Sequence, residues 1–167
     1  KQAVTAIQRL ISQYQVTAII GDMFSSTTLA IAPIAQQNGV ALVTPTAAAV
    51  DIPATGDEIF TIYPSSAFEG EFMAQQAVER GVQTAGIIVQ QVQAAEEIAA
   101  AFSAAVSQHG VRIAYTQRFP GGTRDFRSII ASMKAHTVDA IFVSAYGQEA
   151  CSLLQQAREI ELPGLIL

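Results

Sequence analysis

Short apolar segments alternate with helical segments along the chain, and this alternation constrains the fold more than any other feature of the sequence. The apolar segments predict strands at residues 17–20, 41–44, 59–63, 84–89, 111–116 and 139–144, and a last strand from Leu165. Helical spacing of apolar residues predicts helices at residues 2–15, 26–37, 66–80, 94–108, 124–135 and 147–160. Strands that alternate with helices form βαβ units with right-handed crossovers. The sequence therefore predicts an α/β fold, in which Rossmann-like parallel sheets are flanked by helices.

The composition narrows the class of protein. Half of the 167 residues are apolar and 14% are charged, which excludes a disordered chain. No apolar run approaches the roughly 18 residues that a membrane-spanning helix needs. The net charge of −5 and the scattered Lys and Arg residues argue against nucleic acid as a partner.

A domain boundary is predicted near Tyr63-Pro64, giving one domain at residues 1–63 and a second at 64–167. The first of these holds two βα units and one strand, which are too few to close a stable lobe. The chain also starts at Lys1 inside a helical pattern and stops at Leu167 inside an apolar run. We therefore expect a piece of a longer protein, whose exposed sheet edges favour a homodimer or a swap of segments between chains.

One stretch, Thr17 to Thr28, has the pattern of an anion site. A short apolar strand ends at Gly21, and a cluster of hydroxyl residues then opens a helix. The N-terminus of a helix offers free backbone N–H groups and the positive end of the helix dipole, so it can receive a carboxylate without a cationic side chain. The alternative is structural, because Ser25 or Ser26 can simply cap the helix.

Polar and aromatic residues also follow the later strands, at Thr44 to Ala48, at Gln90-Gln91 and at Ser144 to Tyr146. The carboxyl ends of parallel strands meet at one edge of a sheet, where ligands bind in folds of this class. Hydroxyls, backbone amides and an aromatic wall suit a small carboxylate or zwitterion. The predicted ligand-binding residues are Phe24, Ser25, Ser26, Thr46, Ala47, Ala48, Gln91 and Tyr146.

Catalytic and metal-binding patterns are absent from the sequence. His109 and His136 each stand at the end of a predicted helix, where a capping role is expected. Cys151 stands among apolar helix residues and is expected to be a small core residue. Neither a glycine-rich phosphate loop nor metal-ligand spacing is present. We expect no enzyme activity, no cofactor and no metal; an α/β enzyme is the least favoured alternative.

The order of several segments resembles the type I periplasmic binding proteins, and within them the leucine/isoleucine/valine-binding proteins of ABC importers. The segments, in order and with similar spacing, are Ala18-Ile-Ile-Gly21, Ser25-Ser-Thr-Thr28, Ala32-Pro-Ile-Ala35, Val40-Ala-Leu-Val-Thr-Pro45, Phe119-Pro-Gly-Gly-Thr-Arg-Asp-Phe126, Val138-Asp-Ala-Ile-Phe-Val143 with Tyr146, and Leu154-Gln-Gln-Ala-Arg158. This resemblance implies two lobes that close on a ligand, of which the chain would hold the later part of the first and most of the second.

The resemblance also implies roles for single residues. Ser25 matches a serine whose hydroxyl holds the ligand carboxylate, and Thr46 matches a residue whose carbonyl accepts from the ligand ammonium. Ala48 stands where amino-acid binders carry a threonine, so only its N–H group would remain. Tyr146 matches a pocket tyrosine of the second lobe. Ala95 stands where the family has another pocket tyrosine, so that wall would be lost.

The resemblance therefore implies a non-catalytic, extracytoplasmic solute-binding protein, periplasmic or a cell-surface lipoprotein. Its ligand would be a branched-chain or other amino acid or a small carboxylate, and its partners the membrane subunits of an ABC importer. The alternative is a ligand-sensing or regulatory module of the same fold, which acts through protein contacts as receptor ectodomains and activators of cell-wall synthases do.

Overall fold

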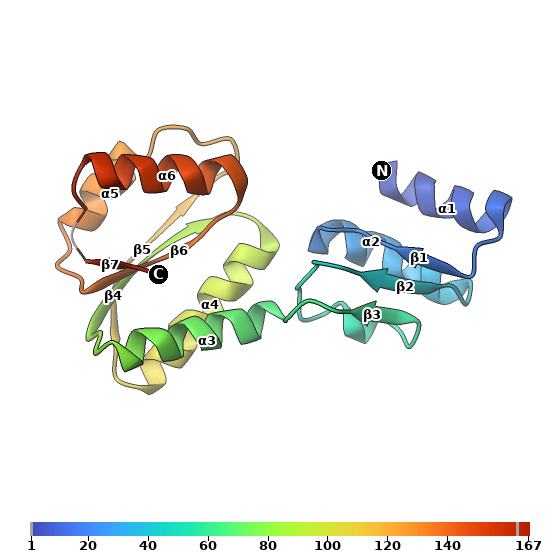
Figure 1. Cartoon of the computed structure of the whole chain (residues 1–167), viewed down its shortest axis with the longest axis horizontal. Coiled ribbons are helices and arrows are strands. Elements are labelled where there is room, and N and C mark those ends of the chain that lie inside the picture. Colours follow the sequence, from blue (N-terminus) through green and yellow to red (C-terminus); the bar gives the residue numbers. More distant parts are fainter. Residues whose placement is uncertain (1, 163) are drawn as a thin grey trace. The chain divides into compact units, whose positions relative to one another are not determined.

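The computed structural model of the protein describes residues 2–162 and 164–167, and it has the predicted α/β fold (Figure 1). Its helices are α1 (Gln2–Tyr14), α2 (Ser25–Gln37), the short 3₁₀-helix η1 (Pro53–Thr55), α3 (Ser66–Glu79), α4 (Gln93–Gln108), α5 (Arg127–Lys134) and α6 (Gly147–Glu159). Its strands are β1 (Ala18–Ile20), β2 (Ala41–Thr44), β3 (Ile59–Thr61), β4 (Thr84–Gln90), β5 (Arg112–Phe119), β6 (Ala140–Ser144) and β7 (Leu165–Ile166).

The chain divides into two compact units, the first ending at Ser66 and the second starting at Ala67. The division falls at the start of α3, a few residues after the boundary that the sequence predicts. Each unit has its own parallel sheet and its own hydrophobic core.

The first unit is a three-stranded parallel sheet in the order β1-β2-β3. Its core is formed by α1, α2 and the inward-facing residues of the strands. In this core, Leu42 of β2 and Ile59 of β3 pack with Ile7 of α1 and Ile31 of α2. Gly39 ends α2 with a φ of +62°, a left-handed conformation that glycine adopts without steric cost. The turn at Gly39 brings the chain from α2 directly into β2.

The other face of this sheet is apolar as well. Ile20, Val43 and Phe60 stand opposite one another on three neighbouring strands, and Ile20 is 83% exposed. The sequence of β1 suits a strand that is covered on both faces. Within the part of the chain that the structure describes, the core of this unit forms on one face only.

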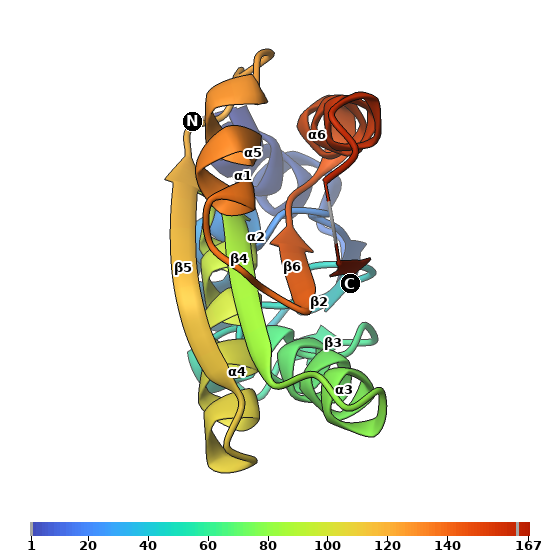
Figure 2. The same ribbon diagram turned by 90° about the vertical axis from the view of Figure 1, so that its left-hand side faces the viewer.

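The second unit is a four-stranded parallel sheet in the order β5-β4-β6-β7, and Figure 2 shows β5, β4 and β6 side by side. From β4 the chain crosses to β5 on one side, and then returns past β4 to β6 on the other side. The strand order therefore reverses at β4. In open α/β sheets, the carboxyl end of the strand where the order reverses is the usual place for a ligand.

Alternate residues of β4 enter two separate cores. Ile87 and Val89 pack with α3 and α4, whereas Ile88 packs with α5 and α6. Figure 1 shows these two pairs of helices on opposite sides of the sheet. A strand buried on both faces explains why residues 84–90 read as an almost continuous apolar run.

Two sequence predictions need correction in this unit. Cys151 is exposed and is not a core residue, because α6 packs through Leu153 and Ala157, and position 151 lies on a different side of the helix. Helix α5 starts at Arg127 rather than 124, because Gln156 holds the preceding loop: it donates to the Arg124 carbonyl and accepts from the Phe126 N–H.

Candidate functional site

Ser25 is the centre of the candidate site in the first unit. It is the first residue of α2, and its side chain is buried, with 7% of its surface exposed. Its Oγ accepts hydrogen bonds from the backbone N–H groups of Ala48, at 3.2 Å, and Ala49, at 3.1 Å. The hydroxyl hydrogen of Ser25 has no acceptor among the described residues, so it is available to an anion. Two donors on one oxygen polarise its O–H bond and strengthen the hydrogen bond that it donates.

The capping alternative for Ser25 and Ser26 is wrong. The N-cap of α2 is Phe24, and no side chain caps the helix. The backbone N–H groups of Ser25 and Ser26 have no hydrogen-bond partner among the residues described, whereas Thr27 and Thr28 donate to the Phe24 carbonyl. Two free donors at the positive end of α2 are what a carboxylate binds.

Hydrogen bonds between two loops fix the shape of this helix N-terminus. The Asp22 carbonyl accepts from Thr44 Oγ1 at 2.7 Å and from Thr28 Oγ1 at 3.3 Å, and Thr46 Oγ1 donates to the Met23 carbonyl at 3.0 Å. The Asp22 side chain accepts from the Phe24 N–H at 2.8 Å. The loop after β1 is therefore joined to the loop after β2, as expected for two neighbouring parallel strands.

The other predicted ligand-binding residues of this unit differ in whether their polar groups are free to bind a ligand. Phe24, Ser26 and Thr46 are exposed, and no described residue donates to the Thr46 carbonyl. Ala47 is buried and donates to Thr44 Oγ1 at 3.1 Å, which is a supporting role. The N–H group of Ala48 is already bound to Ser25 Oγ. Ser25, Ser26 and Thr46 therefore lie together at the carboxyl edge of the first sheet. They are the predicted residues of this unit that keep free polar groups.

In the second unit, the two glutamines at the carboxyl end of β4 differ in burial. Gln91 is exposed, whereas Gln90 is buried and its Oε1 accepts from the Tyr146 N–H at 2.9 Å. Tyr146 is the N-cap of α6 and is partly exposed, so the carboxyl ends of β4 and β6 do meet as predicted. Successive strand residues point to opposite faces, but the sequence does not show which of two terminal glutamines faces inward.

Ala95, which the resemblance places at the position of a pocket tyrosine, lies in the first turn of α4. It is fully buried in the core beneath α4, and its carbonyl accepts from Ser144 Oγ at 3.0 Å. Position 95 therefore joins α4 to the end of β6.

The glycine loop after β5 is held by Glu149. The Gly122 N–H donates to Glu149 Oε1 at 2.7 Å, and this hydrogen bond holds the pKa of the carboxyl below its ordinary value. Because the folded pKa is the lower one, the contact stabilises the fold above the unfolded pKa, and this contribution is lost as the pH falls through the folded pKa.

We therefore expect Glu149→Gln to lower the Tm slightly at pH 7. The difference from the natural chain should shrink as the pH falls from the ordinary glutamate pKa of about 4.3 through the lower folded pKa, because the Glu149 carboxylate then becomes protonated. A thermal melt monitored by circular dichroism at several pH values measures this. A difference in Tm that stays constant from pH 7 to pH 3 would contradict the assignment of the contact.

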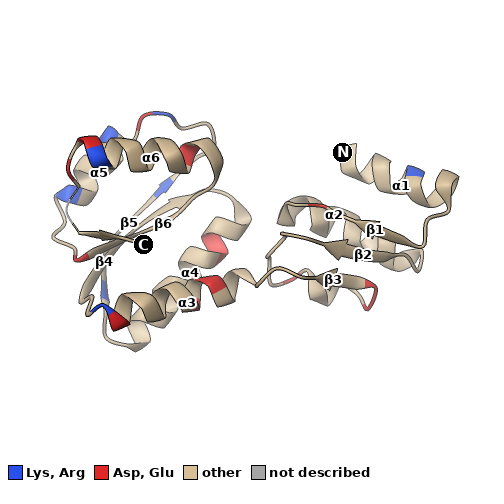
Figure 3. Cartoon of the chain, viewed as in Figure 1, with Lys and Arg blue, Asp and Glu red and all other residues tan. Residues whose placement is uncertain are grey.

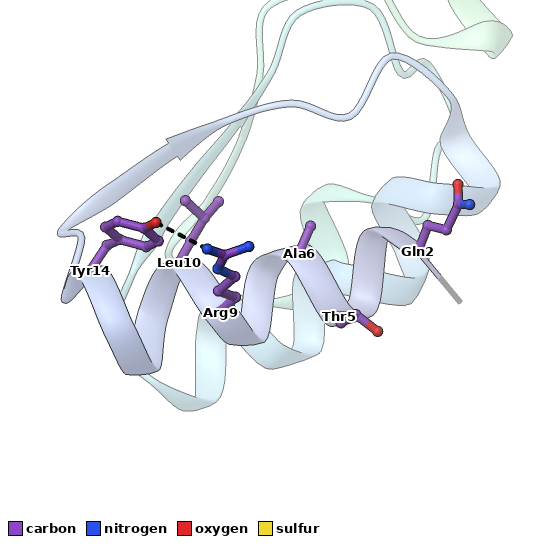
Figure 4. A pocket seen from close by; sticks show the side chains of 6 residues that line it. All are labelled: Gln2, Thr5, Ala6, Arg9, Leu10 and Tyr14. Carbon is purple, nitrogen blue, oxygen red and sulfur yellow. Dashed lines mark hydrogen bonds between the residues drawn. The ribbon is translucent and has the colours of Figure 1, made fainter.

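A hollow of about 700 Å³ lies along α1, away from these strand ends (Figure 4). It is lined by Gln2, Thr5, Ala6, Arg9, Leu10 and Tyr14. Arg9 Nη2 donates to the Tyr14 hydroxyl at 3.3 Å. The hollow contains none of the predicted ligand-binding residues.

The histidines occupy structural positions. His109 is the C-cap of α4, as predicted. His136 follows α5, where its ring stacks on Tyr115 and its Nδ1 lies 2.8 Å from the Ser132 carbonyl. Over residues 2–162 and 164–167, no cluster of His, Cys, Asp and Glu could hold a metal ion. No helix in the same part of the chain is long and apolar enough to cross a membrane.

In the part of the chain that the structure describes, the basic residues are scattered over several elements. Figure 3 shows Lys and Arg spread over α1, β5, α5 and α6, with acidic residues between them. A nucleic-acid interface gathers its cations on one face.

The chain matches one protein family over nearly its whole length. The family is described as periplasmic binding protein, and the match covers residues 1–166. Among curated relatives, a leucine-, isoleucine-, valine-, threonine- and alanine-binding protein of Pseudomonas aeruginosa is 27% identical over 97% of this chain and 44% of its own length. A Leu/Ile/Val/Thr-binding protein of Salmonella typhimurium is 25% identical over 95% of this chain and 44% of its own length. The chain thus spans less than half the length of these relatives.

Solved structures with the same fold hold different ligands. The branched-chain amino acid transporter substrate-binding protein of Streptococcus pneumoniae, solved with isoleucine, has a TM-score of 0.90 and 24% identity over 99% of this chain and 47% of its own. A solute-binding protein of Rhodopseudomonas palustris was solved with p-hydroxybenzoic acid. It has a TM-score of 0.91 and 22% identity, over 98% of this chain and 46% of its own. From the family match and these shared folds, the chain belongs to the periplasmic binding protein family and has its type I fold.

Proposed function

We propose that this chain is the ligand-binding part of an extracytoplasmic solute-binding protein, which delivers a small carboxylate to the membrane subunits of an ABC importer. The relatives are named for leucine, isoleucine, valine and threonine, and one of them also for alanine; the structures with the same fold hold isoleucine or p-hydroxybenzoic acid. Every one of these ligands has a carboxylate. We therefore infer the shared chemistry first, and treat the rest of the ligand as the point that experiment decides.

The observation that carries the proposal is the geometry of Ser25. Its Oγ is fixed by two backbone donors, its own hydroxyl hydrogen is uncommitted, and two free N–H groups of α2 lie beside it. These groups give three donors for a carboxylate at the positive end of a helix. The Thr46 carbonyl, which is also free, would suit the ammonium of an amino acid.

Ala48 sets the limit on affinity for an amino acid. An alanine side chain cannot give the hydroxyl that the resemblance places there, and loss of a hydrogen bond to a charged group costs about 1.5–3 kcal/mol. An aromatic or hydroxylated acid that gains other contacts would compensate for this loss. Exposed Met23 and Phe24 beside the site favour a flat, apolar ligand body.

Isothermal titration calorimetry of the protein from its complete reading frame tests the proposal. The panel is leucine, isoleucine, valine, threonine, benzoate and 4-hydroxybenzoate. We expect heat of binding for at least one of them, and no heat from the corresponding amides, which lack the carboxylate. A correctly folded protein that binds no member of the panel would refute the proposal.

A sensor or regulatory module of the same fold is the second candidate. The Ala48 N–H favours this candidate, because it already donates to Ser25 Oγ within the chain. Fewer donors therefore remain for a ligand carboxylate than the resemblance implies for an amino-acid binder. A kinase or helical-repeat domain in the complete reading frame, together with no heat of binding, would favour this candidate over the importer.

Association between chains stays a separate prediction. The in-register apolar residues Ile20, Val43 and Phe60, on the open face of the first sheet, favour association of this 167-residue chain with itself. Light scattering over a hundredfold range of concentration measures it. A monomer at every concentration would remove the prediction.

A further inference from the structure

The hydroxyl of Thr44 joins the two loops that form the candidate carboxylate site of the first unit. Thr44 is the last residue of β2, and its side chain is fully buried. Its Oγ1 donates to the Asp22 carbonyl at 2.7 Å, in the loop after β1, and accepts from the Ala47 N–H at 3.1 Å, in the loop after β2. One buried hydroxyl therefore serves as donor to one loop and as acceptor for the other.

The backbone of Thr44 is fixed by the sheet. Thr44 pairs with Thr61 of β3, and its carbonyl accepts from the Ile62 N–H at 3.3 Å. The next residue is Pro45, which restricts the residue before it to an extended conformation. The hydroxyl is thus presented by a strand, and strands hold a functional group more precisely than loops do.

Three consecutive backbone N–H groups in the loop after β2 donate to hydroxyl oxygens. Ala47 donates to Thr44 Oγ1, whereas Ala48 and Ala49 donate to Ser25 Oγ at 3.2 and 3.1 Å. All three alanines are buried, so their N–H groups depend on the two hydroxyls as partners. The bond at Ala47 comes first along the loop, and it sets where the next two donors lie.

We propose that Thr44 is a positioning residue of the carboxylate site, which acts on the ligand through Ser25. The inference rests on the proposed function and deepens it. By holding Ala47, Thr44 keeps the next two N–H groups against Ser25 Oγ, and the Ser25 hydroxyl hydrogen then stays available to the ligand. Its second bond holds the Asp22 carbonyl, three residues before Ser25, and so fixes the start of α2 against the same loop.

Loss of the Thr44 hydroxyl would leave the Ala47 N–H buried without a partner. Such a donor is costly, and the loop would shift to satisfy it. The Ser25 side chain would then no longer be fixed before the ligand arrives. The ligand would have to order this side chain and the loop on binding, which lowers its affinity.

Thr44→Val tests this role in the protein from the complete reading frame, because valine has a shape similar to threonine and lacks the hydroxyl. At a temperature at which the variant is folded, calorimetry should show about tenfold weaker binding of a carboxylate from the panel. Thr44→Ser keeps the hydroxyl, and its affinity should stay within about twofold of the natural value. Equal losses in Thr44→Val and Thr44→Ser would refute the role of the hydroxyl.

Thr55→Val is the matched control. Thr55 is in η1 of the same unit, and its Oγ1 donates to the Ile52 carbonyl at 2.6 Å. The same substitution there removes a hydroxyl–carbonyl hydrogen bond that involves neither loop of the site. It should leave the ligand affinity unchanged. A loss as large as that in Thr44→Val would show that the effect is a general weakening of the unit, and the inference would fail.

A double-mutant cycle shows whether Thr44 acts through Ser25. Thr44→Val should weaken binding about tenfold in the natural chain but less than about twofold when Ser25→Ala is already present, since the group that it positions is then missing. A merely structural role would give the same fold-change in both chains. That result would refute the inference.

Hydrogen exchange of the natural chain provides a test that needs no variant. Without ligand, the amides of Ala47, Ala48 and Ala49 should exchange slowly in NMR spectra, because their hydrogen bonds are formed before a ligand binds. If these amides exchange as fast as those of an unstructured loop, Thr44 does not hold the loop and the inference is refuted.

The outcomes separate this inference from the proposed function. If a carboxylate binds, and Thr44→Val binds it as tightly as the natural chain does, the proposed function stands and the role of Thr44 is refuted. If no member of the panel binds, the proposed function fails and the inference fails with it.

Discussion

Ser25→Ala is expected to destabilise the first unit by about 2–4 kcal/mol, because it removes the acceptor of two buried N–H groups at once. An unsatisfied buried donor costs about 1–3 kcal/mol, and Ala48 and Ala49 would both lose their partner. A domain is stable by only about 5–15 kcal/mol in total. Urea denaturation followed by circular dichroism measures the loss.

Ser12→Ala is the control for this experiment. Ser12 is an exposed serine of α1 in the same unit, so its replacement should change stability by less than about 0.5 kcal/mol. If both variants unfold at the same urea concentration, the two hydrogen bonds to Ser25 do not contribute to stability.

The same variant should also lose ligand affinity. A hydrogen bond to a carboxylate is worth about 1.5–3 kcal/mol, which corresponds to a fall in affinity of about 10- to 150-fold. Calorimetry at a temperature at which the variant is still folded measures the loss of affinity separately from the loss of stability. Unchanged affinity in a folded Ser25→Ala protein would show that the carboxylate binds elsewhere.

Phe102→Ala is expected to cost the second unit about 3–5 kcal/mol, the range for loss of a buried aromatic side chain. The Phe102 ring is fully buried and stacks on Phe142 of β6, with 4.1 Å between the ring centroids. It lies where α3 and α4 approach closely, because a Cβ at Gly70 would stand 2.7 Å from the Phe102 nitrogen. Neighbouring groups held so closely cannot move in to fill the cavity.

Phe72→Ala provides the comparison. Phe72 is on α3 of the same unit, but half of its surface is exposed and it stacks more loosely on Phe68. Its loss should cost less than about 1 kcal/mol. Hydrogen exchange of the β4 amides should accelerate strongly in Phe102→Ala and hardly at all in Phe72→Ala. Equal acceleration in the two variants would contradict the assignment of this core.

The elements of the fold were predictable because their signals are local. The strand at residues 41–44 was predicted with its observed bounds, since a short apolar run there is enclosed by Gly39 and Pro45. The end of β5 was missed because it depends on a partner. Gln117 and Arg118 are polar and interrupt the apolar run before Phe119. These three residues nevertheless pair with β4, as far as Gln90↔Phe119.

The sequence predicts where the candidate site lies, but it does not show the contacts that shape it. Strand ends and the hydroxyl cluster pointed to Ser25, whereas its true partners, Ala48 and Ala49, come more than twenty residues later. No local pattern distinguishes a serine that caps its own helix from one that binds a distant loop. For the same reason, the sequence does not show that Gln90 is buried and accepts from the Tyr146 N–H.

A ¹H–¹⁵N NMR titration with a carboxylate that binds in the calorimetric panel tests the central claim most directly. The account predicts saturable shifts of the backbone amide resonances of Ser25 and Ser26, with the same dissociation constant that calorimetry gives. Shifts confined to the hollow along α1, with the Ser25 and Ser26 resonances unmoved at saturation, would contradict it.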